Sequence, residues 1–426
     1  MKVMVVGSGA REHAIVWSLS SSPGVDAILT VPGNAGTASL GTNLPGYPED
    51  SEGLARIAED ESVGLTVVGP EAPLAGGIVD LFRERGLPIF GPTKVAARIE
   101  SSKGFAKELM RRHGVPCPEF RVFDAYDQAR DFLSKHDGPV VVKADGLAAG
   151  KGVLMCDGRE EALRALDTCM KDRAFGEAGD TVLVEECLEG WEVSVFAFSD
   201  GESVSPLVAA CDYKRLLDGD AGPNTGGMGS YSPAEAWTPQ LEDIVGREII
   251  SPVVKAMKAE GTPYQGVLYA GLMVTDEGPK VLEFNCRLGD PETQVILPLL
   301  EADLSDVLLS SVSGGVENLK MQWRDGACVG VVMASGGYPH KYVNGLPITG
   351  LEDLDSDVEI FHASTRLADN DPTRVLTDGG RVLTMVGRGD TLALARERVY
   401  DNIHRVRFQD AQYRKDIALL RRAVPS

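Results

Sequence analysis

Two oxygen-bearing side chains, Glu283 and Asn285, alternate along an apolar segment that reads VLEFN at positions 281–285. A period of two is typical of a β-strand, so both side chains are predicted to lie on one face of it. A carboxylate and an amide oxygen without a nearby histidine favour Mg²⁺ (or Mn²⁺), which also takes ligands from phosphates and water. The segment therefore predicts a metal site that works together with a bound phosphate.

Charged residues continue directly after this segment, in the sequence CRLGDPET at 286–293. Arg287 could stabilise negative charge on a phosphoryl group during its transfer. Asp290 and Glu292 follow within a Gly-Asp-Pro turn. A surface cluster of ion pairs would explain these charges, but it would not explain a tight turn placed at the end of the strand.

A glycine-rich segment, KADGLAAGKG at 143–152, lies between two apolar runs. A Walker A loop requires G-x4-G-K-[ST] and a following helix, whereas Gly146 and Gly150 stand one residue too close and a strand follows. The segment instead predicts a mobile hairpin that closes over a polyphosphate, with backbone N–H groups and Lys143 as donors. Closure would exclude water during the reaction. A flexible surface hairpin without a ligand is the alternative.

Two further segments offer polar groups to a nucleotide or a small substrate. An acidic turn at 185–192 could bind an adenine edge through its backbone and ribose through a carboxylate, although acidic turns are usually only solvated. The second segment runs from Asp212 and Lys214 to GPNTGGMG at 222–229. Its glycines predict a long loop to Pro233 that brings small polar donors close to a substrate, with a disordered loop as the alternative.

The N-terminal segment, VMVVGSGAREH at 3–13, places a glycine turn between an apolar strand and a predicted helix. A dinucleotide fingerprint, G-x-G-x-x-G, would need a glycine where Glu12 stands, and no acidic residue ends the second strand. Binding of NAD is therefore disfavoured. Free N–H groups at the helix start, with Arg11 beside them, predict a generic anion site, and a plain tight turn is the alternative.

Two patterns of predicted secondary structure position these residues. In the first hundred residues, apolar runs that end at glycine or proline alternate with helix-like stretches, at 2–6, 27–31, 65–68 and 88–90. This rhythm predicts a doubly wound parallel sheet, which binds ligands at the carboxyl ends of its strands. A helix is predicted at 102–112, and beyond it hairpins such as 268–275 with 280–285 predict an α+β region of mostly antiparallel sheet. A charged helix is predicted at 390–406.

Composition narrows the classes of protein. The 426 residues include 42 Lys and Arg against 63 Asp and Glu, a formal charge of −21, so the chain lacks the cationic footprint of a nucleic-acid binder. Seven cysteines without a CxxC spacing favour a reducing cytoplasm over a disulfide framework or a zinc site. No apolar run of about 18 residues occurs, and the start is too broken for a secretory signal, so no membrane contact is expected.

Together these segments resemble the ATP-grasp ligases, in which a glycine hairpin, an acidic hinge and a carboxylate strand occur in this order. The resemblance extends to the family of phosphoribosylamine–glycine ligases (glycinamide ribonucleotide synthetases) and covers nearly the whole chain, including GGRVL at 379–383. The segments that carry it are GSGAREHA at the N-terminus, PGNAGT at 32–37, VGPEAPL at 68–74, KADGLAAGKGV at 143–153, GPNTGGMG at 222–229 and EFNCRLGDPETQ at 283–294.

The resemblance implies an α/β and α+β multidomain fold. Its parts would be an N-terminal Rossmann-like (pre-ATP-grasp) domain at 1–101, an ATP-grasp domain at 102–315 with a mobile lid at about 120–190, and a C-terminal mixed α/β domain at 316–426. The implied ligands are ATP, Mg²⁺ or Mn²⁺, glycine and 5-phosphoribosylamine. We also expect a cytoplasmic monomer.

The resemblance further assigns roles by position. Catalytic roles are implied for Arg287, Lys143 and Asp290. ATP binding is implied for Lys103, Lys143, Gly150, Glu185, Glu186, Leu188 and Glu192. Substrate binding is implied for Gly9, Arg11, Glu71, Asp212, Lys214, Asn224, Thr225, Gly226, Gly227, Met228, Arg287 and Asp290. Metal binding is implied for Glu283 and Asn285, while the acid that many ATP-grasp enzymes carry on the preceding strand is missing from 269–274.

The implied reaction joins glycine to 5-phosphoribosylamine through glycyl phosphate in purine biosynthesis, and it needs no side-chain nucleophile. Three alternatives remain. Another ATP-grasp ligase would use a different acid or amine, which the 222–229 loop disfavours. A nucleotide-binding regulator without turnover would not need the intact set of Lys143, Glu283, Asn285 and Arg287. A nicotinamide-dependent oxidoreductase is suggested only by the first two glycines of the N-terminal turn.

Overall fold

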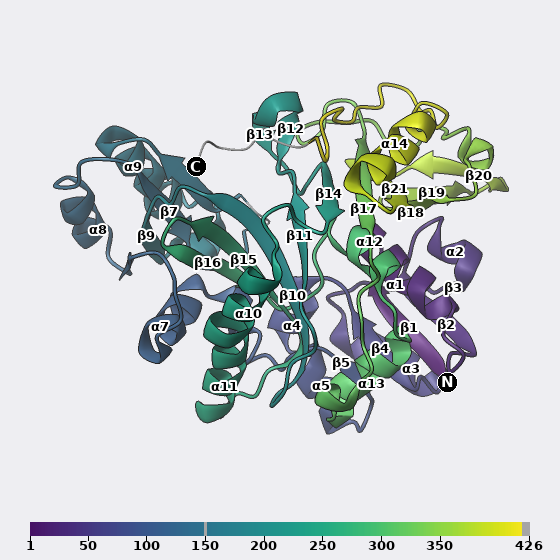
Figure 1. Ribbon diagram of the computed structural model, residues 1–426, viewed down its shortest axis with the longest axis horizontal. Coiled ribbons are helices and arrows are strands. Elements are labelled where there is room, and N and C mark those ends of the chain that lie inside the picture. The colour runs from purple at the N-terminus through teal and green to yellow at the C-terminus, as the bar shows by residue number, and fades with distance from the viewer. Residues whose placement is uncertain (149–150, 420–426) are drawn as a thin grey trace.

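The computed structural model describes residues 1–148 and 151–419. Its N-terminal part is a five-stranded parallel sheet in the order β3-β2-β1-β4-β5 (Figure 1). The strands are β1 (Lys2–Gly7), β2 (Ala27–Pro32), β3 (Thr42–Asn43), β4 (Leu65–Val68) and β5 (Ile89–Phe90). The connecting helices are α1 (Ala10–Ser20), α2 (Thr37–Leu40), α3 (Ser51–Asp60), α4 (Glu71–Gly76) and α5 (Ile78–Glu84). The doubly wound parallel sheet predicted for this region is confirmed.

The strand order of this sheet reverses between β1 and β4. From β1 the chain moves outward to β2 and β3, and it then returns to place β4 on the other side of β1. The loops that follow β1 and β4 therefore leave toward opposite faces and open a crevice at their carboxyl ends, where ligands of such sheets bind.

A helix pair leads from this sheet into the rest of the chain. It consists of α6 (Arg98–Ser101) and α7 (Lys103–His113). The side chain of Ser102 accepts a hydrogen bond from the N–H of Phe105 at 3.1 Å and so caps the start of α7. The helix predicted at 102–112 is confirmed.

A small four-stranded sheet in the order β6-β9-β7-β8 follows. Its strands are β6 (Phe120–Phe123), β7 (Val140–Ala144), β8 (Val153–Cys156) and β9 (Val182–Glu186), and it carries α8 (Tyr126–Leu133), α9 (Arg159–Leu166), η1 (Asp167–Lys171) and η2 (Gly176–Gly179). It has its own apolar core around Leu133, Val142 and Leu166. The glycine-rich segment is the β7–β8 hairpin connection, in which Lys143 lies opposite Val153.

The largest sheet is antiparallel and has eight strands in the order β16-β15-β10-β11-β14-β17-β21-β18. Its strands are β10 (Trp191–Asp200), β11 (Val208–Asp212), β14 (Gly229–Ser232), β15 (Gln265–Thr275), β16 (Gly278–Asn285), β17 (Ala327–Ala334), β18 (Val358–His362) and β21 (Arg381–Gly389). Strand β14 pairs with β11 on one side and β17 on the other, so the central and C-terminal parts share one sheet.

The prediction of a long loop that runs to Pro233 is wrong. The segment contains a hairpin, β12 (Arg215–Leu217) with β13 (Ala221–Asn224), and then the buried strand β14. The physical reason is that β14 is held by main-chain pairing to β11 and β17. Main-chain pairing does not require an apolar sequence, so the glycine and serine of this strand gave no local signal.

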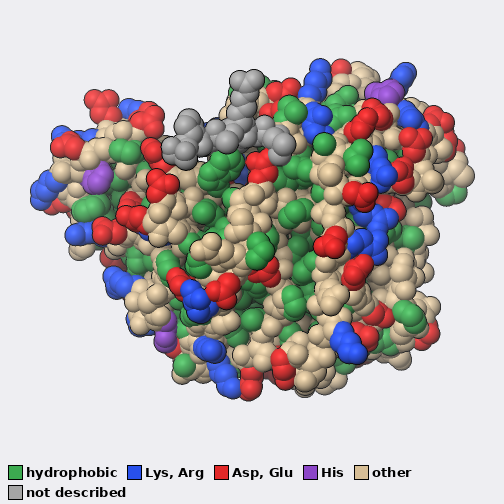
Figure 2. Space-filling model, in the orientation of Figure 1, with side chains coloured by type: hydrophobic (Ala, Val, Ile, Leu, Met, Phe, Trp, Pro, Cys, Tyr) green, Lys and Arg blue, Asp and Glu red, His purple; other side chains and the backbone are tan. Residues whose placement is uncertain are grey.

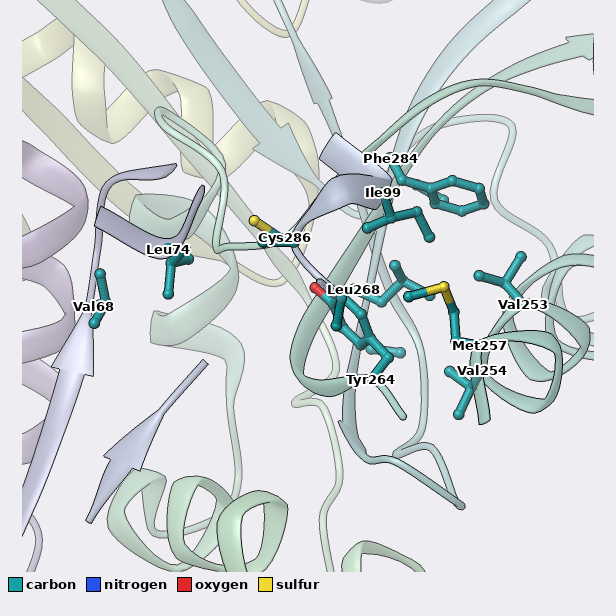
Figure 3. Close-up of a cluster of buried hydrophobic side chains, with 14 of the residues drawn as sticks. Val68, Leu74, Ile99, Val253, Val254, Met257, Tyr264, Leu268, Phe284 and Cys286 are labelled. Atoms are coloured by element: carbon teal, nitrogen blue, oxygen red, sulfur yellow. The ribbon is translucent and has the colours of Figure 1, made fainter. Parts of the chain in front are cut away.

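The remaining helices cover these sheets. They are α10 (Pro239–Val245), η4 (Gly246–Ile250), α11 (Ser251–Ala259), α12 (Thr293–Ile296), η5 (Leu297–Leu299), α13 (Leu304–Ser313), η6 (Val316–Asn318), η7 (Leu351–Asp353) and α14 (Leu392–Ile403). A hairpin of β19 (Thr365–Ala368) and β20 (Asp371–Thr377) lies beside them. In Figure 3, Val253 and Met257 of α11 pack beside Leu268 and Phe284 of the large sheet, which fixes β16 from behind. No helix in residues 1–148 and 151–419 is long and apolar enough to cross a membrane.

Candidate active site

A cavity lies where α6, α7, the β7–β8 hairpin and β16 meet. Acidic and basic side chains are interspersed over the face shown in Figure 2. The cavity, in contrast, gathers several charged side chains around one space. The charged and polar residues that line the cavity are Glu71, Glu100, Lys103, Lys107, Glu283, Asn285 and Arg287. Gly146, Ala148 and Gly152 line it from the hairpin side.

Two lysines of α7, Lys103 and Lys107, form one wall of this cavity. Lys103, the first residue of α7, donates from Nζ to the carbonyl of Gly146 at 2.8 Å and so ties the helix to the hairpin. Lys143 on β7 is buried, and its Nζ lies 2.8 Å from the Glu185 carboxylate and 3.2 Å from the Leu282 carbonyl. Burial lowers the pKa of Lys103, against the opposing effect of the nearby Glu283.

The Glu185 carboxylate points into this wall. Its Oε2 lies 3.2 Å from Nζ of Lys107 and 2.8 Å from Nζ of Lys143. Its Oε1 is buried and has no hydrogen-bond partner among the residues that the structure describes. Burial lowers the pKa of Lys107 to about 8, although Glu185 acts to raise it. Sequence reasoning missed Lys107, since a single lysine on a helix has no distinguishing local signal.

The other residues predicted to bind ATP lie at different distances from this wall. Glu186 accepts from the N–H of Glu119 at 3.0 Å, and Leu188 follows in the half-buried turn between β9 and β10. Glu192 pairs with Lys214 at 2.6 Å. Gly150 lies outside the described residues.

Glu283 and Asn285 stand two residues apart on β16, as predicted, and both line the cavity. Burial acts to raise the pKa of Glu283, but Lys214, Lys143 and Lys103 lower it overall, which keeps the carboxylate ionised. On the paired strand β15 a glycine, Gly271, stands opposite Glu283.

These two side chains fit a hard divalent cation. In the described part of the chain no group of three or more His, Cys, Asp or Glu side chains is arranged to hold a metal ion. An ionised carboxylate and an amide oxygen would therefore bind Mg²⁺ together with phosphate oxygens and water, which is how Mg²⁺ is commonly held.

Arg287 lies between two carboxylates. Its Nε is 3.3 Å from Glu71 Oε2, its Nη2 is 3.3 Å from Glu100 Oε1, and the same Nη2 donates to Asn285 Oδ1 at 3.3 Å. Burial acts to raise the pKa of Glu71, but Arg287 and then Arg11 lower it overall. Glu100, which also accepts from the N–H of Cys286 at 2.8 Å, was missed by sequence reasoning because it is brought here only by the fold.

Arg381 of the C-terminal part holds two predicted substrate segments together. Its Nη2 lies 2.8 Å from Asp290 Oδ2, and its Nη1 donates to the carbonyls of Gly226 at 2.6 Å and Asp290 at 3.1 Å. The hydroxyl of Tyr338 accepts from the N–H of Gly226 at 3.0 Å. Burial acts to raise the pKa of Asp290, but Arg381 and Arg11 lower it overall. Both C-terminal residues were missed, although the segment GGRVL was noted.

The rest of the 212–228 segment is divided between surface and core. Asn224 is exposed, Thr225 donates from its hydroxyl to the Lys214 carbonyl at 2.9 Å, and Gly227 has a positive φ of 108°. The side chain of Met228 is fully buried and faces the core. Burial raises the pKa of Asp212, against the opposing charge of Lys214.

The glycine turn after β1 differs from the open anion site predicted for it. The N–H of Gly9 donates to Glu12 Oε2 at 2.6 Å, and Nε of Arg11 lies 2.6 Å from Glu12 Oε1. Arg11 also donates from Nη1 to the carbonyl of Leu288 at 3.3 Å. The protein's own carboxylate therefore occupies the start of α1, because a glutamate at the third helical position can fold back onto the N-cap.

Comparison with known proteins identifies relatives of the chain. The phosphoribosylglycinamide synthetase models match residues 1–100 (N domain), 101–293 (ATP-grasp (A) domain) and 328–420 (C domain). A phosphoribosylamine–glycine ligase of Ralstonia nicotianae is 50% identical over 419 residues, which cover 98% of this chain and 98% of that protein.

Solved structures resemble the fold. A crystal structure of phosphoribosylamine–glycine ligase from Thermotoga maritima has a TM-score of 0.83 at 36% identity and covers 98% of this chain and 100% of that chain. A biotin carboxylase domain of Hydrogenobacter thermophilus 2-oxoglutarate carboxylase, in complex with MgADP, has a TM-score of 0.73 at 15% identity and covers 97% of this chain and 91% of that chain. The second likeness is one of fold alone.

Proposed function

This chain belongs to the phosphoribosylglycinamide synthetase family, and we propose that its cavity carries out the ADP-forming ligation of glycine to 5-phosphoribosylamine, giving glycinamide ribonucleotide in purine biosynthesis. The observation that carries this proposal is the convergence of Lys103, Glu283 and Arg287 on one cavity under the β7–β8 hairpin. One site therefore combines a cation for phosphates (Lys103), an oxygen ligand for a metal ion (Glu283) and a guanidinium for the transferring group (Arg287).

The first step activates glycine. A carboxylate oxygen of glycine attacks the γ-phosphorus of ATP, the bond to the β-phosphate oxygen breaks, and glycyl phosphate and ADP form. Glu283 and Asn285 would hold Mg²⁺ or Mn²⁺, which would neutralise charge on the phosphates when bound. Lys103 and Lys143 hold phosphate oxygens, with Lys143 exchanging the Glu185 carboxylate for phosphate, and Arg287 stabilises the charge of the group in transfer.

The second step forms the amide. The 1-amine of 5-phosphoribosylamine attacks the carbonyl carbon of glycyl phosphate, phosphate leaves with the pair of electrons of the C–O bond, and the amine proton passes to the departing phosphate. Glu71 and Asp290 have lowered pKa values and stay ionised, so they attract the amino groups of both substrates. Gly9, Arg11, Asp212, Lys214 and the 224–228 segment complete the site around the sugar phosphate and glycine.

The nucleotide base would lie at the turn between β9 and β10. We assign adenine to the backbone of Glu185, Glu186 and Leu188, and ribose to Glu192. Since Glu192 pairs with Lys214 at 2.6 Å, ribose binding would compete with this partly exposed ion pair. Such a pair is weak enough to be exchanged, at about 1 kcal/mol or less.

The test is phosphate release from MgATP with glycine and freshly formed 5-phosphoribosylamine, added singly and together. Release that requires both substrates, with glycinamide ribonucleotide identified by mass, is the expected result. Nucleotide binding without phosphate release under any combination would contradict the proposal and favour a nucleotide-binding regulator.

A further inference from the structure

The crevice between the ends of β1 and β4 is filled by a side chain of the protein itself. The sheet order reverses between these two strands, and ligands of open α/β sheets ordinarily bind at such a point. Here the side chain of Glu12, from the first turn of α1, lies in the crevice with only 3% of its surface exposed.

Three glycines make room for this carboxylate. A Cβ atom added at Gly7 would lie 2.7 Å from Glu12 Cδ, one at Gly9 would lie 2.7 Å from Glu12 Oε2, and one at Gly69 would come closer still to Glu12 Oε1. Gly7 ends β1 and Gly69 follows β4, so the glycines come from both sides of the crevice. A helix cap alone would explain the contact with Gly9, but it would not explain glycines at the ends of two different strands.

The carboxylate also connects three parts of the candidate substrate site. It accepts from the N–H of Gly9, whose Cβ position would be 3.6 Å from Asp290 Oδ2. It holds the guanidinium of Arg11, whose charge lowers the pKa of both Glu71 and Asp290. Through Gly69 it touches the loop that leads, after one proline, to Glu71.

We propose that Glu12 is a positioning residue whose carboxylate stands where a dinucleotide-binding sheet would hold a phosphate, and that it fixes Gly9, Arg11 and the Glu71 loop for the amine substrate. This inference rests on the proposed function, because it concerns the site for 5-phosphoribosylamine. It also explains why the glycine turn after β1, which resembles a dinucleotide-binding turn, holds no phosphate and instead supports the site proposed for 5-phosphoribosylamine. The space and the backbone donor that a pyrophosphate would use are already taken.

The experiment compares Glu12→Ala, which empties the crevice, with Glu12→Gln, which keeps its shape and removes the charge. We expect the KM for 5-phosphoribosylamine to rise between about tenfold and a hundredfold in both variants, because small displacements of positioning groups have effects of this size. The affinity for MgADP, measured by titration calorimetry, is expected to stay within about twofold, since Glu12 is not among the residues that line the nucleotide cavity.

Chemical rescue separates positioning from simple loss of stability. In Glu12→Ala, sodium formate is expected to lower the KM for 5-phosphoribosylamine toward the wild-type value in a saturable way, because a small carboxylate fits the emptied space. Sodium chloride at equal ionic strength is not expected to change this KM. The matched control is Asp50→Ala, which removes a cap of α3 in the same domain, where Asp50 accepts from the N–H of Gly53 at 2.9 Å. It is expected to lower stability without changing the KM.

The outcomes are distinguishable. Unchanged KM in Glu12→Gln, or equal losses of MgADP and 5-phosphoribosylamine binding, would overturn the inference, and Glu12→Gln alone decides it if Glu12→Ala does not fold. Wild-type protein that makes no amide in the same assay would contradict the proposed function instead.

Discussion

The crevice after β1 and the cavity under the β7–β8 hairpin contain similar groups and differ in where the charges point. Both are bordered by glycines, and both combine carboxylates with basic side chains. In the crevice, Glu12 and Arg11 face each other and are 3% and 9% exposed. In the cavity, Arg287 and Glu71 are 17% and 32% exposed and share an open space with Lys103. Satisfied charges form a scaffold, and charges that converge on open space form a site for a ligand.

The largest expected effect tests the cavity side of this comparison. Replacement of Arg287 by alanine removes the guanidinium from between Glu71 and Glu100 and is expected to lower kcat by about 10³-fold, because the charge of the transferring group loses its partner. Phosphate release under saturating substrates measures it. The control, Arg287→Lys, should retain part of the activity, and a loss below tenfold in the alanine variant would place the chemistry elsewhere.

The second largest effect is on stability, and it concerns the buried Glu185 carboxylate, which is already paired with lysines. In Glu185→Gln, Lys107 and Lys143 lose their shared carboxylate, and the free energy of unfolding is expected to fall by about 3 kcal/mol because buried charges are left unpaired. Urea unfolding measures the change. Glu260→Gln, which breaks an exposed pair with Arg112, should cost less than about 1 kcal/mol, and equal losses in both variants would refute the distinction.

A pH experiment tests two buried histidines, of which His13 follows Glu12 on α1. Burial lowers the pKa of His13 from 6.5 to about 3 and that of His362 from 6.5 to about 4, and His13 Nδ1 accepts from the His362 N–H at 2.8 Å. Below pH 6.5 the unfolded chain binds protons that the folded chain does not, so stability falls as pH falls. The expected loss is about 1 kcal/mol per histidine between pH 6.5 and 5.5.

Urea unfolding at pH 7.5, 6.5 and 5.5 measures this dependence. A double variant, His13→Asn with His362→Asn, should show a correspondingly shallower fall. Identical pH dependence in the variant and the wild type would mean that folding does not lower the pKa of these histidines.

The smallest expected effect sharpens the assignment of the metal ligands. Glu283→Gln keeps the shape of the side chain and removes its charge, so the Mg²⁺ concentration for half-maximal activity is expected to rise by about tenfold. Glu277→Gln, in the turn of the same hairpin, is the control, since Glu277 is exposed and pairs with Lys280. An unchanged Mg²⁺ requirement in Glu283→Gln would remove Glu283 from the metal site.

Much of the fold could be predicted from local patterns. The parallel strands around residues 2–6 and 65–68 and the hairpin of β15 with β16 have the periods and turns expected of them. Strand β14 was missed because its partners, β11 and β17, supply the pairing from distant parts of the chain. Local patterns do not contain that information.

The candidate site divides in the same way. Glu283, Asn285 and Arg287 were found because they are close in sequence to a turn at the end of one strand. Arg381 and Glu100 were missed because only the fold brings them to Asp290 and Arg287. Glu12 was read only as the residue that breaks a motif, whereas its side chain fills the space that the motif would leave for a ligand.

The shared eight-stranded sheet has a consequence for how the protein is made. A ribosome completes β10, β11 and β14 long before β17, which pairs with β14, and β21 comes later still. During synthesis the nascent chain therefore presents β14 with one bare edge, the kind of surface on which strands of other chains add. The chain can bury this edge only once the strand at 327–334 has left the ribosome, so messages truncated before that point should yield protein that aggregates.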